Sequence, residues 1–306
     1  MKEYIDFSKE VEEALKFGKP VVAIETAGTF EGFDYPDNIE LAKLVTDKIR
    51  ANGAVPAYIG IVKGRIKVGL EAEDMQYLAN PKEMLIKASR RDIPMLITKG
   101  YDALTAVAST MMIADMVGIK VVTGGGIGGV HRGVQTSFDI SADLKEFVKS
   151  DVVVVCSGAK SILDLNLTME YLETHAVSVV GYKTLELPAY MAIHSGIKLD
   201  YSVNSPDEVA KYVDVKNKLG IKSGLLLANP IEEKYAVDSE KMNAAIDKAV
   251  QKAKDDGITG KVITKYIMNI VAQEMGGDSQ EACLHMNINN ASLASEIACA
   301  IHSYDK

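Results

Sequence analysis

The feature that most constrains the fold is an alternation along the chain between short β-branched runs and longer amphipathic stretches. Residues 20–25 have the pattern of a buried strand, and residues 37–50 follow with apolar side chains at helical spacing. Such alternation predicts a layered α/β domain, with antiparallel pairing around residues 61–70 making the sheet mixed. Further strands are expected at 56–62, 93–98, 119–123, 151–156, 177–180 and 223–227, and further helices at about 103–117, 141–149, 161–174 and 206–219.

The C-terminal part of the chain has a different pattern. From about Asp238 onward, helical patterns at 241–254, 260–275 and 290–302 succeed one another with no strand between them. No linker, charge run or internal repeat separates this portion from the α/β body. We therefore expect a single domain over residues 1–306, with a helical C-terminal portion packed on the sheet.

The charge balance narrows the classes of partner. Lys and Arg number 34 and Asp and Glu number 42, so the formal net charge is −8. Binding to a nucleic acid polymer requires basic surface, so we expect no such partner. A small anionic ligand stays possible because a few local cations can hold one phosphate group.

Cysteine usage and hydropathy indicate the compartment. The three cysteines are far apart, with no zinc-like spacing, and no apolar run is long enough to span a bilayer. The N-terminal residues lack the pattern of a secretory signal. We expect a soluble, reduced, cytoplasmic protein without a membrane partner.

Polar residues follow several of the expected strands. In open α/β sheets, ligands bind at the carboxyl ends of the strands. The segments 25–28, 98–100, 123–132 and 157–160 come directly after apolar runs, so they are the candidate site segments.

The segment 124–129 fits the spacing G-x-G-x-x-G. A dinucleotide site needs a helix directly after this motif, and the residues that follow are poor helix formers. A loop that lines a smaller anionic ligand is favoured, and a purely structural crossover is the alternative.

Lys160 and Glu25 are the candidate catalytic residues. Lys160 follows a strand after three small residues, with Ser161 placed to cap the next helix. A desolvated amine at this position could form an imine, although a solvated lysine is the simpler interpretation. Glu25 ends the first buried strand and is either a general acid or base or a capping and salt-bridge residue.

Two further segments suggest phosphate or metal binding. Ser141 is a good helix N-cap between Asp139 and Asp143, so this segment offers amides for phosphate and carboxylates for a hard cation. Ordinary capping is the alternative. Residues 87–92 place Lys87 and two arginines before an expected strand, which predicts either a phosphate clamp or a solvated face.

Several motifs together resemble the pseudouridine-5'-phosphate glycosidase family, which includes the indigoidine synthase A-like proteins. They occur in the same order over about residues 7–302, nearly the whole chain. The motifs are VAIET at 22–26, KASRRDIP at 87–94, the glycine loop 123–133, FDISADL at 138–144, CSGAKSILDL at 156–165, TMEYLET at 168–174, ANPI at 228–231 and NASLASEIA at 290–298.

This resemblance implies an α/β/α sandwich, a homotrimer, and a divalent metal that is usually manganese. It also implies reversible cleavage of the C–C glycosidic bond of pseudouridine 5'-phosphate to uracil and ribose 5-phosphate. The matching positions give Lys160 as the nucleophile that forms an imine with C1', Glu25 as the proton donor and acceptor, and Asp139 as the metal ligand. Substrate-contacting positions are matched by Lys87, Val107, His131, Ser141, Ala142 and Asp143.

The chain departs from the family pattern at four clustered positions. Glu31 stands where relatives carry histidine, and Cys283 where they carry an asparagine associated with the base. Ala106 and Gly124 replace threonines. The sugar-phosphate and catalytic positions are thus kept, whereas positions expected to face the aglycone differ. The alternative to plain family activity is the same chemistry with another aglycone, and neutral drift is the competing explanation.

Two other classes stay open at this level. A non-catalytic phosphosugar-binding protein would need neither Lys160 nor Glu25, so the presence of both argues against it. A nicotinamide-dependent oxidoreductase rests on the glycine loop alone.

Overall fold

The computed structural model describes residues 3–258 and 262–304, and these residues form one large sheet and one small one. The large sheet contains β1 (Ile5–Phe7), β2 (Val21–Glu25), β3 (Val55–Val62), β4 (Arg65–Val68), β5 (Ile86–Ala88), β6 (Ala103–Thr105), β7 (Val121–Thr123), β9 (Val153–Cys156), β11 (Ser178–Tyr182), β12 (Ser202–Val203) and β13 (Leu225–Ala228). The small sheet pairs β8 (Val130–His131) with β10 (Leu163–Asp164).

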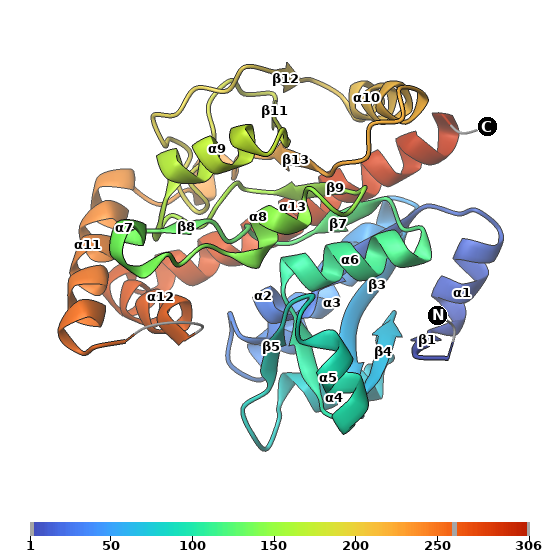
Figure 1. The fold of residues 1–306 in the computed structure, drawn as a ribbon, viewed down its shortest axis with the longest axis horizontal. Coiled ribbons are helices and arrows are strands. Elements are labelled where there is room, and N and C mark those ends of the chain that lie inside the picture. The colour runs from blue at the N-terminus through green and yellow to red at the C-terminus, as the bar shows by residue number, and fades with distance from the viewer. Residues whose placement is uncertain (1–2, 259–261, 305–306) are drawn as a thin grey trace.

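The strand order of the large sheet is β1-β4-β3-β2-β7-β9-β13-β11-β12, with β5 and β6 attached beside β3 (Figure 1). The run from β3 through β2 to β12 is parallel. Strands β4 and β6 run antiparallel to β3. The mixed sheet and the antiparallel pairing expected near residues 61–70 are therefore confirmed.

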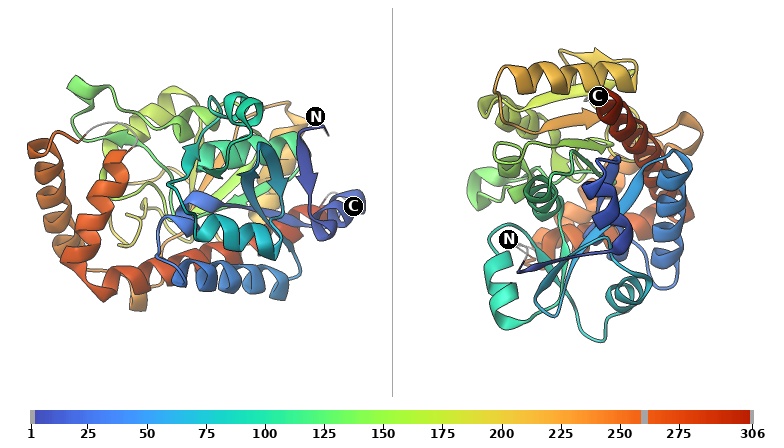
Figure 2. Two further views of the ribbon diagram at one scale, coloured as in Figure 1. Left: turned by 90° about the horizontal axis from the view of Figure 1, so that it is seen from below. Right: turned by 90° about the vertical axis from the view of Figure 1, so that its right-hand side faces the viewer.

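Helices cover both faces of this sheet (Figure 2). In β2, Val21 and Ala23 pack into one apolar cluster while Val22 and Ile24 pack into the other, as strand alternation requires. The helices are α1 (Lys9–Lys16), α2 (Thr26–Phe30), α3 (Asp37–Ala51), α4 (Ala72–Ala79), α5 (Ile93–Lys99), α6 (Val107–Val117), α7 (Val134–Ser137), α8 (Ala142–Glu146), α9 (Leu165–Thr174), α10 (Pro206–Lys218), α11 (Ser239–Asp255), α12 (Ile263–Met275) and α13 (Gly277–Tyr304), with a 3-10 turn η1 (Glu233–Tyr235).

These layers confirm the α/β/α sandwich. One core cluster joins the sheet to α1, α6, α8, α9, α11 and α12, and the other joins it to α3, α4, α10 and most of α13. The helical C-terminal portion is also confirmed, and the start that was expected for its second helix, at residue 260, lies outside the described residues.

The strand expected at residues 93–98 is wrong, because this segment is helix α5. Pro94 lies in the first helical turn, where a missing amide hydrogen costs no intrahelical bond. Gly100 ends the helix in the left-handed conformation, with φ of 68°. The segment 98–100 consequently does not follow a strand and is no part of the site.

Two expected helices begin later than predicted. Residues 103–105 form β6, because they pair with β3 and β5 before α6 begins at Val107. Helix α9 begins at Leu165 with Asp164 as its N-cap, whereas the Ser161 hydroxyl donates to the Ala189 carbonyl, 2.7 Å away. Ser161 is therefore not the cap that its position suggests.

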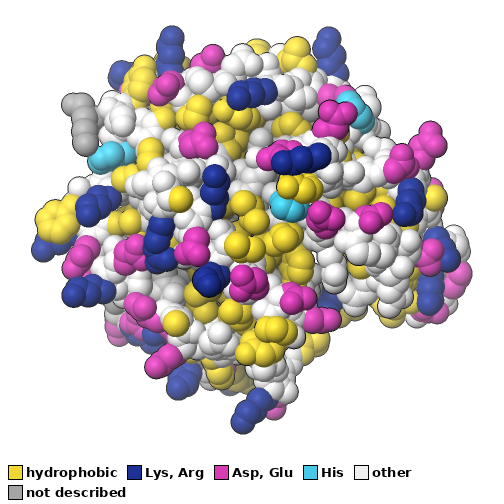
Figure 3. Space-filling view, turned by 180° about the vertical axis from the view of Figure 1, so that it is seen from behind, with side chains coloured by type: hydrophobic (Ala, Val, Ile, Leu, Met, Phe, Trp, Pro, Cys, Tyr) yellow, Lys and Arg dark blue, Asp and Glu magenta, His cyan; other side chains and the backbone are white. Residues whose placement is uncertain are grey.

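The surface carries mixed charge. On the face seen in Figure 3, acidic and basic side chains alternate around a central group of hydrophobic ones. Among the described residues, no helix combines the length and apolar character needed to cross a membrane.

A buried asparagine joins α13 to the strand ends beneath the candidate site. The Asn290 side-chain amide donates to the Gly124 carbonyl at 3.0 Å, and its oxygen accepts from the Asn229 amide at 2.9 Å. It also lies within hydrogen-bonding distance of the Ser157 hydroxyl. One side chain from α13 therefore connects the loops that follow β7, β9 and β13.

Replacing Asn290 with alanine should lower the free energy of unfolding by about 1–3 kcal/mol, because several buried polar groups lose their partner. Urea denaturation followed by circular dichroism measures this change. The exposed Asn217→Ala in α10 is the matched control and should stay within about 0.5 kcal/mol of the parent protein. Equal stability of the two variants would contradict the role given to Asn290.

Candidate active site

Glu25 occupies the junction between β2 and α2. It ends the strand and precedes the first turn of the helix, and its side chain is 3% exposed. Cβ atoms added at Gly28 and Gly124 would lie 2.5 Å and 2.7 Å from Glu25 Oε1. Two glycines thus make room for this carboxyl group, which explains why the glycine loop passes close to it.

Lys160 lies on the turn after β9, as its position in the sequence predicts. The Lys160 amide donates to the Ile127 carbonyl at 3.1 Å, and the Ile127 amide donates to Gly158 at 3.0 Å. The turn is therefore bound side by side with the glycine loop after β7. This backbone pairing fixes where the lysine side chain begins.

Glu25 and Lys160 line the same pocket, whose volume is about 600 Å³. Burial raises the pKa of Glu25 to about 7, although the nearby charges of Lys160 and Lys87 act in the opposite direction. Burial and the Lys87 charge lower the pKa of the Lys160 amine. Both shifts favour the neutral forms, so burial promotes a proton donor at Glu25 and an uncharged amine at Lys160.

Lys87 extends from β5 into this pocket, where its Nζ lies 3.9 Å from Glu31 Oε2. Arg90 and Arg91, the two nearby arginines, do not line the pocket. Arg90 donates through Nε to the buried Glu146 at 2.8 Å, and the exposed Arg91 lies near Asp92. The expected cation cluster is consequently reduced to one pocket-facing lysine.

Val107, Ser141, Ala142 and Asp143 gather behind the glycine loop rather than in the pocket lining. Ser141 caps α8, as predicted, by accepting from the Asp143 amide. The Asp143 carboxylate accepts from the Gly128 and Ala108 amides, both at 2.8 Å. Asp143 therefore joins the glycine loop to the first turn of α6, which begins at Val107, and is not available as a metal ligand.

His131 and Asp139 form a separate pair beside this group. The His131 amide donates to the Asp139 carbonyl at 3.0 Å, and neither residue lines the pocket. Burial lowers the pKa of His131, while the Asp139 charge acts to raise it. Within residues 3–258 and 262–304, the Asp139 carboxylate makes no hydrogen bond or ion pair, and no three His, Cys, Asp or Glu side chains cluster to hold a metal.

The glycine loop does not satisfy the structural context of a dinucleotide site. Strand β7 is followed by β8 and the four-residue α7, so no long helix opens at the loop. A Cβ added at Gly126 would lie 2.7 Å from the ring of Tyr190. The glycines instead allow side chains to approach closely.

Tyr190 is a pocket residue that sequence reasoning missed. It has φ of 63°, an uncommon value for a bulky residue, and its amide donates to the Ser157 carbonyl at 3.0 Å. The segment around it is irregular, so neither periodicity marks it. A strained backbone of this kind often accompanies a functional site.

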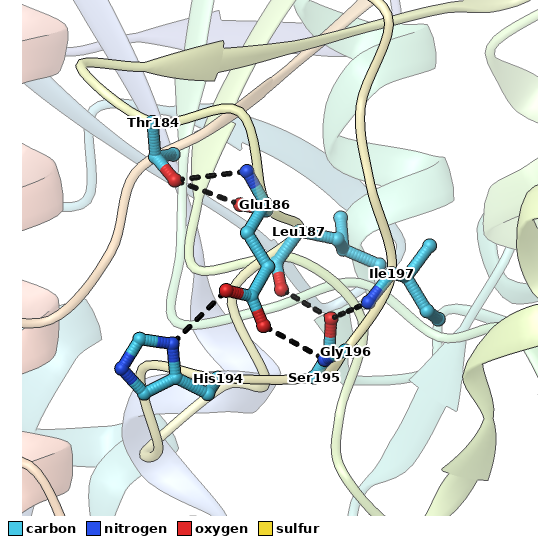
Figure 4. A network of polar contacts seen from close by, with 7 residues as sticks. All are labelled: Thr184, Glu186, Leu187, His194, Ser195, Gly196 and Ile197. Carbon is cyan, nitrogen blue, oxygen red and sulfur yellow. Dashed lines mark hydrogen bonds and ion pairs between the residues drawn. The ribbon is translucent and has the colours of Figure 1, made fainter.

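The segment between β11 and β12, which contains Tyr190, forms a local polar network (Figure 4). The Glu186 carboxylate accepts from the Gly196 amide at 2.7 Å and lies 3.0 Å from His194 Nδ1. The Ser195 hydroxyl donates to the Leu187 carbonyl. These bonds close the segment on itself on either side of Tyr190.

The first turns of α13 form another wall of the pocket, which includes Cys283 and Asn287. Cys283 Sγ lies 4.0 Å from the Tyr190 hydroxyl and 3.6 Å from Asn287 Nδ2. Burial raises the pKa of the Cys283 thiol to about 11, so it stays uncharged at neutral pH. Of the four departures from the family pattern, Glu31 and Cys283 line the pocket, whereas Ala106 and Gly124 do not.

Comparison with known proteins places this site in context. The family model described as indigoidine synthase A like protein matches residues 10–300. A pseudouridine-5'-phosphate glycosidase of Hahella chejuensis is 48% identical over 99% of this chain and 100% of that protein. One from Escherichia coli is 47% identical over 97% of this chain and 95% of its own length.

Solved structures agree over the whole chain. The prealnumycin C-glycosynthase AlnA in complex with ribulose 5-phosphate superposes with a TM-score of 0.92 at 35% identity, covering 99% of this chain and 98% of that one. An indigoidine synthase A-like protein of Thermotoga maritima gives a TM-score of 0.88 at 31% identity, covering 97% and 96%. With its sequence and its fold in agreement, the chain belongs to the indigoidine synthase A-like family.

Proposed function

We propose that the protein is a pseudouridine-5'-phosphate glycosidase that reversibly cleaves the C–C bond between the ribose phosphate and its aglycone. The observation that carries this proposal is the shared pocket of Lys160 and Glu25, whose environments favour a neutral amine and a protonated carboxyl group. Relatives at 47–48% identity over nearly the whole chain are named for this activity.

The first step uses the Lys160 amine as the nucleophile. Its lone pair attacks C1', the C1'–O4' bond breaks, and O4' takes a proton from Glu25. The ribose is then open and attached to the lysine nitrogen. The lowered pKa of Lys160 increases the fraction of amine that carries a free lone pair.

The second step breaks the C–C bond. The lysine nitrogen supplies electrons that form C1'=N, and the electron pair of the C–C bond goes to the aglycone carbon. Glu25, which has regained a proton from the lysine nitrogen, protonates that carbon. Water then hydrolyses the imine to free Lys160 and ribose 5-phosphate, so the overall reaction consumes one water and involves no oxidation.

The phosphate group is best placed beside Lys87, the cation of segment 87–92 that faces the pocket. Lys87 faces the pocket, and the Ala88 carbonyl next to it accepts from the Ala106 amide at the start of α6. Lys87 supplies the positive charge for the phosphate, because the Ala106 and Ala108 amides of α6 already donate to Ala88 and Asp143. Ser141 and Asp143 support this arrangement by fixing the adjoining glycine loop.

Asp139 is our proposed ligand for a divalent cation such as Mn²⁺. Its carboxylate makes no hydrogen bond or ion pair among the described residues, and ions of this class are commonly held by one or two carboxylates with water and a substrate phosphate. We also propose a cytoplasmic homotrimer, as the family resemblance implies.

Borohydride should trap ribose 5-phosphate as a stable adduct on Lys160, because reduction converts the imine to an amine. Peptide mass spectrometry locates the adduct. Lys160→Ala should give no adduct, whereas Lys211→Ala, an exposed lysine of α10, should give as much as the parent. An adduct that persists in Lys160→Ala would contradict the assigned nucleophile.

The pH profile of kcat/KM for cleavage should be bell-shaped, with one limb at about 7. Cleavage needs Glu25 protonated, so its ionisation through pH about 7 removes the active form. Lys160 must be neutral, so protonation of its amine sets the acid limb of the profile. Because the pKa of Lys160 is lowered, this limb lies at lower pH than it would for an ordinary lysine. Glu25→Gln should lose about 10²-fold or more in rate. A flat profile from about pH 6 to 8 would overturn this assignment.

A further inference from the structure

Two polar side chains deep in the pocket have no part in the proposed chemistry. Tyr190 and Asn287 both line the pocket and are 7% and 9% exposed. Tyr190 lies in the irregular segment between β11 and β12, whereas Asn287 lies in α13, one turn after Cys283. Polar atoms buried to this degree normally have hydrogen-bond partners, so the partners of these two side chains show what the pocket is built to hold.

The side-chain amide of Asn287 has a fixed orientation. Its Nδ2 donates to the Cys283 carbonyl at 2.8 Å, and because a carbonyl can only accept, the nitrogen must be the atom on that side. The other atom, Oδ1, would lie 3.4 Å from a Cβ atom added at Gly125, which also lines the pocket. Within residues 3–258 and 262–304, no group donates a hydrogen bond to Oδ1. It is therefore an acceptor left for a ligand.

The Tyr190 hydroxyl reaches the same place from another segment of the chain. It too would lie 3.4 Å from a Cβ atom on Gly125. Its contact with Cys283 Sγ is long, at 4.0 Å, and a thiol is a weak hydrogen-bond partner. Burial raises the pKa of the hydroxyl well above its ordinary value, and the Glu25 charge adds to the rise, so the oxygen keeps its proton. Tyr190 therefore supplies a donor beside the Asn287 acceptor.

The missing side chain of Gly125 keeps the space in front of both oxygens open. The preceding residue, Gly124, faces the proposed proton donor, because a Cβ atom there would lie 2.7 Å from Glu25 Oε1. The donor–acceptor pair of Tyr190 and Asn287 thus lies one residue along the glycine loop from the Glu25 carboxyl group. A base whose carbon is protonated by Glu25 would extend toward this pair.

The donor–acceptor pair matches one kind of ring edge. A carbonyl next to an N–H satisfies a donor and an acceptor that lie side by side, and uracil presents such an edge. The Met286 methyl group, 3.0 Å from the same Cβ position, adds an apolar contact for the ring. A ring without the N–H, or without the carbonyl, would leave one of the two oxygens unpaired at a cost in binding free energy.

We infer that Tyr190 and Asn287 are the specificity-determining residues for the base: the Tyr190 hydroxyl donates to a ring carbonyl, and Asn287 Oδ1 accepts from the adjacent ring N–H. This inference rests on the proposed function and deepens it, because it assigns the recognition of uracil to two residues that take no part in bond cleavage. Lys160 and Glu25 act on the bond to the ribose, while the donor–acceptor pair holds the base beside Glu25.

The test follows synthesis from uracil and ribose 5-phosphate by the full-length enzyme with Mn²⁺, which gives pseudouridine 5'-phosphate and water. Tyr190→Phe removes the hydroxyl and keeps the ring. KM for uracil should therefore rise about tenfold, while kcat and the KM for ribose 5-phosphate change by about twofold at most. Tyr171→Phe is the matched control, because Tyr171 lies on α9 outside the pocket lining, and it should leave the KM for uracil unchanged.

Two further variants test where the base lies. Asn287→Leu removes the acceptor at similar volume and should raise the KM for uracil about tenfold. Gly125→Ala puts a methyl group 3.4 Å from both oxygens, so it should exclude the ring edge and raise this KM at least as much. Gly277→Ala is its control and should leave the KM unchanged, because a Cβ atom there has no neighbour within 4 Å.

The borohydride adduct with ribose 5-phosphate separates this inference from the proposed function. Every variant should form the adduct in the same yield as the parent, since none changes the residues assigned to the sugar phosphate. A parent enzyme that forms neither the adduct nor pseudouridine 5'-phosphate would overturn the proposed function. An active parent whose Tyr190→Phe and Asn287→Leu variants keep the parental KM for uracil would overturn the assignment of these two residues alone. Loss of the adduct in Tyr190→Phe would do the same, because it would link the hydroxyl to Lys160 rather than to the base.

Discussion

The site depends on the shared burial of a carboxyl group and an amine that would both be charged in water. Glu25 and Lys160 come from different strand ends, and burial shifts the pKa of each toward its neutral form. Removing charged groups from water is costly, so the surrounding structure must hold both in place. The glycine loop, the turn after β9 and the Asn290 side chain provide that restraint through backbone and amide hydrogen bonds.

Much of this arrangement could be predicted from the sequence, because a strand and the residue that ends it are recognisable from a short stretch of residues. Glu25 ends and Lys160 follows a run of buried β-branched residues, and the parallel strands β2, β7 and β9 bring these ends to one edge of the sheet. The layered class and the helical C-terminal portion follow from periodicity. The family resemblance added the roles of individual residues, which spacing alone could not distinguish from capping or solvated alternatives.

The features that the sequence did not predict depend on weak local signals or on contacts between segments far apart in the chain. Residues 93–98 are apolar enough for a strand, and only the proline in the first turn and Gly100 identify a helix. Tyr190 lies in an irregular segment whose conformation is set by bonds to Ser157 and by the Glu186 network. Asp143 seemed a possible metal ligand, but its two carboxylate oxygens are used by the amides of Gly128 and Ala108.

Different turns of helix α13 have different structural roles. Residues such as Ala291 and Ile297 are buried in the core on one face of the sheet, and Asn290 ties the helix to the strand ends. Cys283 and Asn287 face the pocket from the two turns that precede Asn290. Mutation can therefore exchange the pocket-facing side chains while the anchored turns keep the backbone in place. In such a helix, substitutions can alter the side chains that a ligand meets while the buried contacts that hold the helix stay the same.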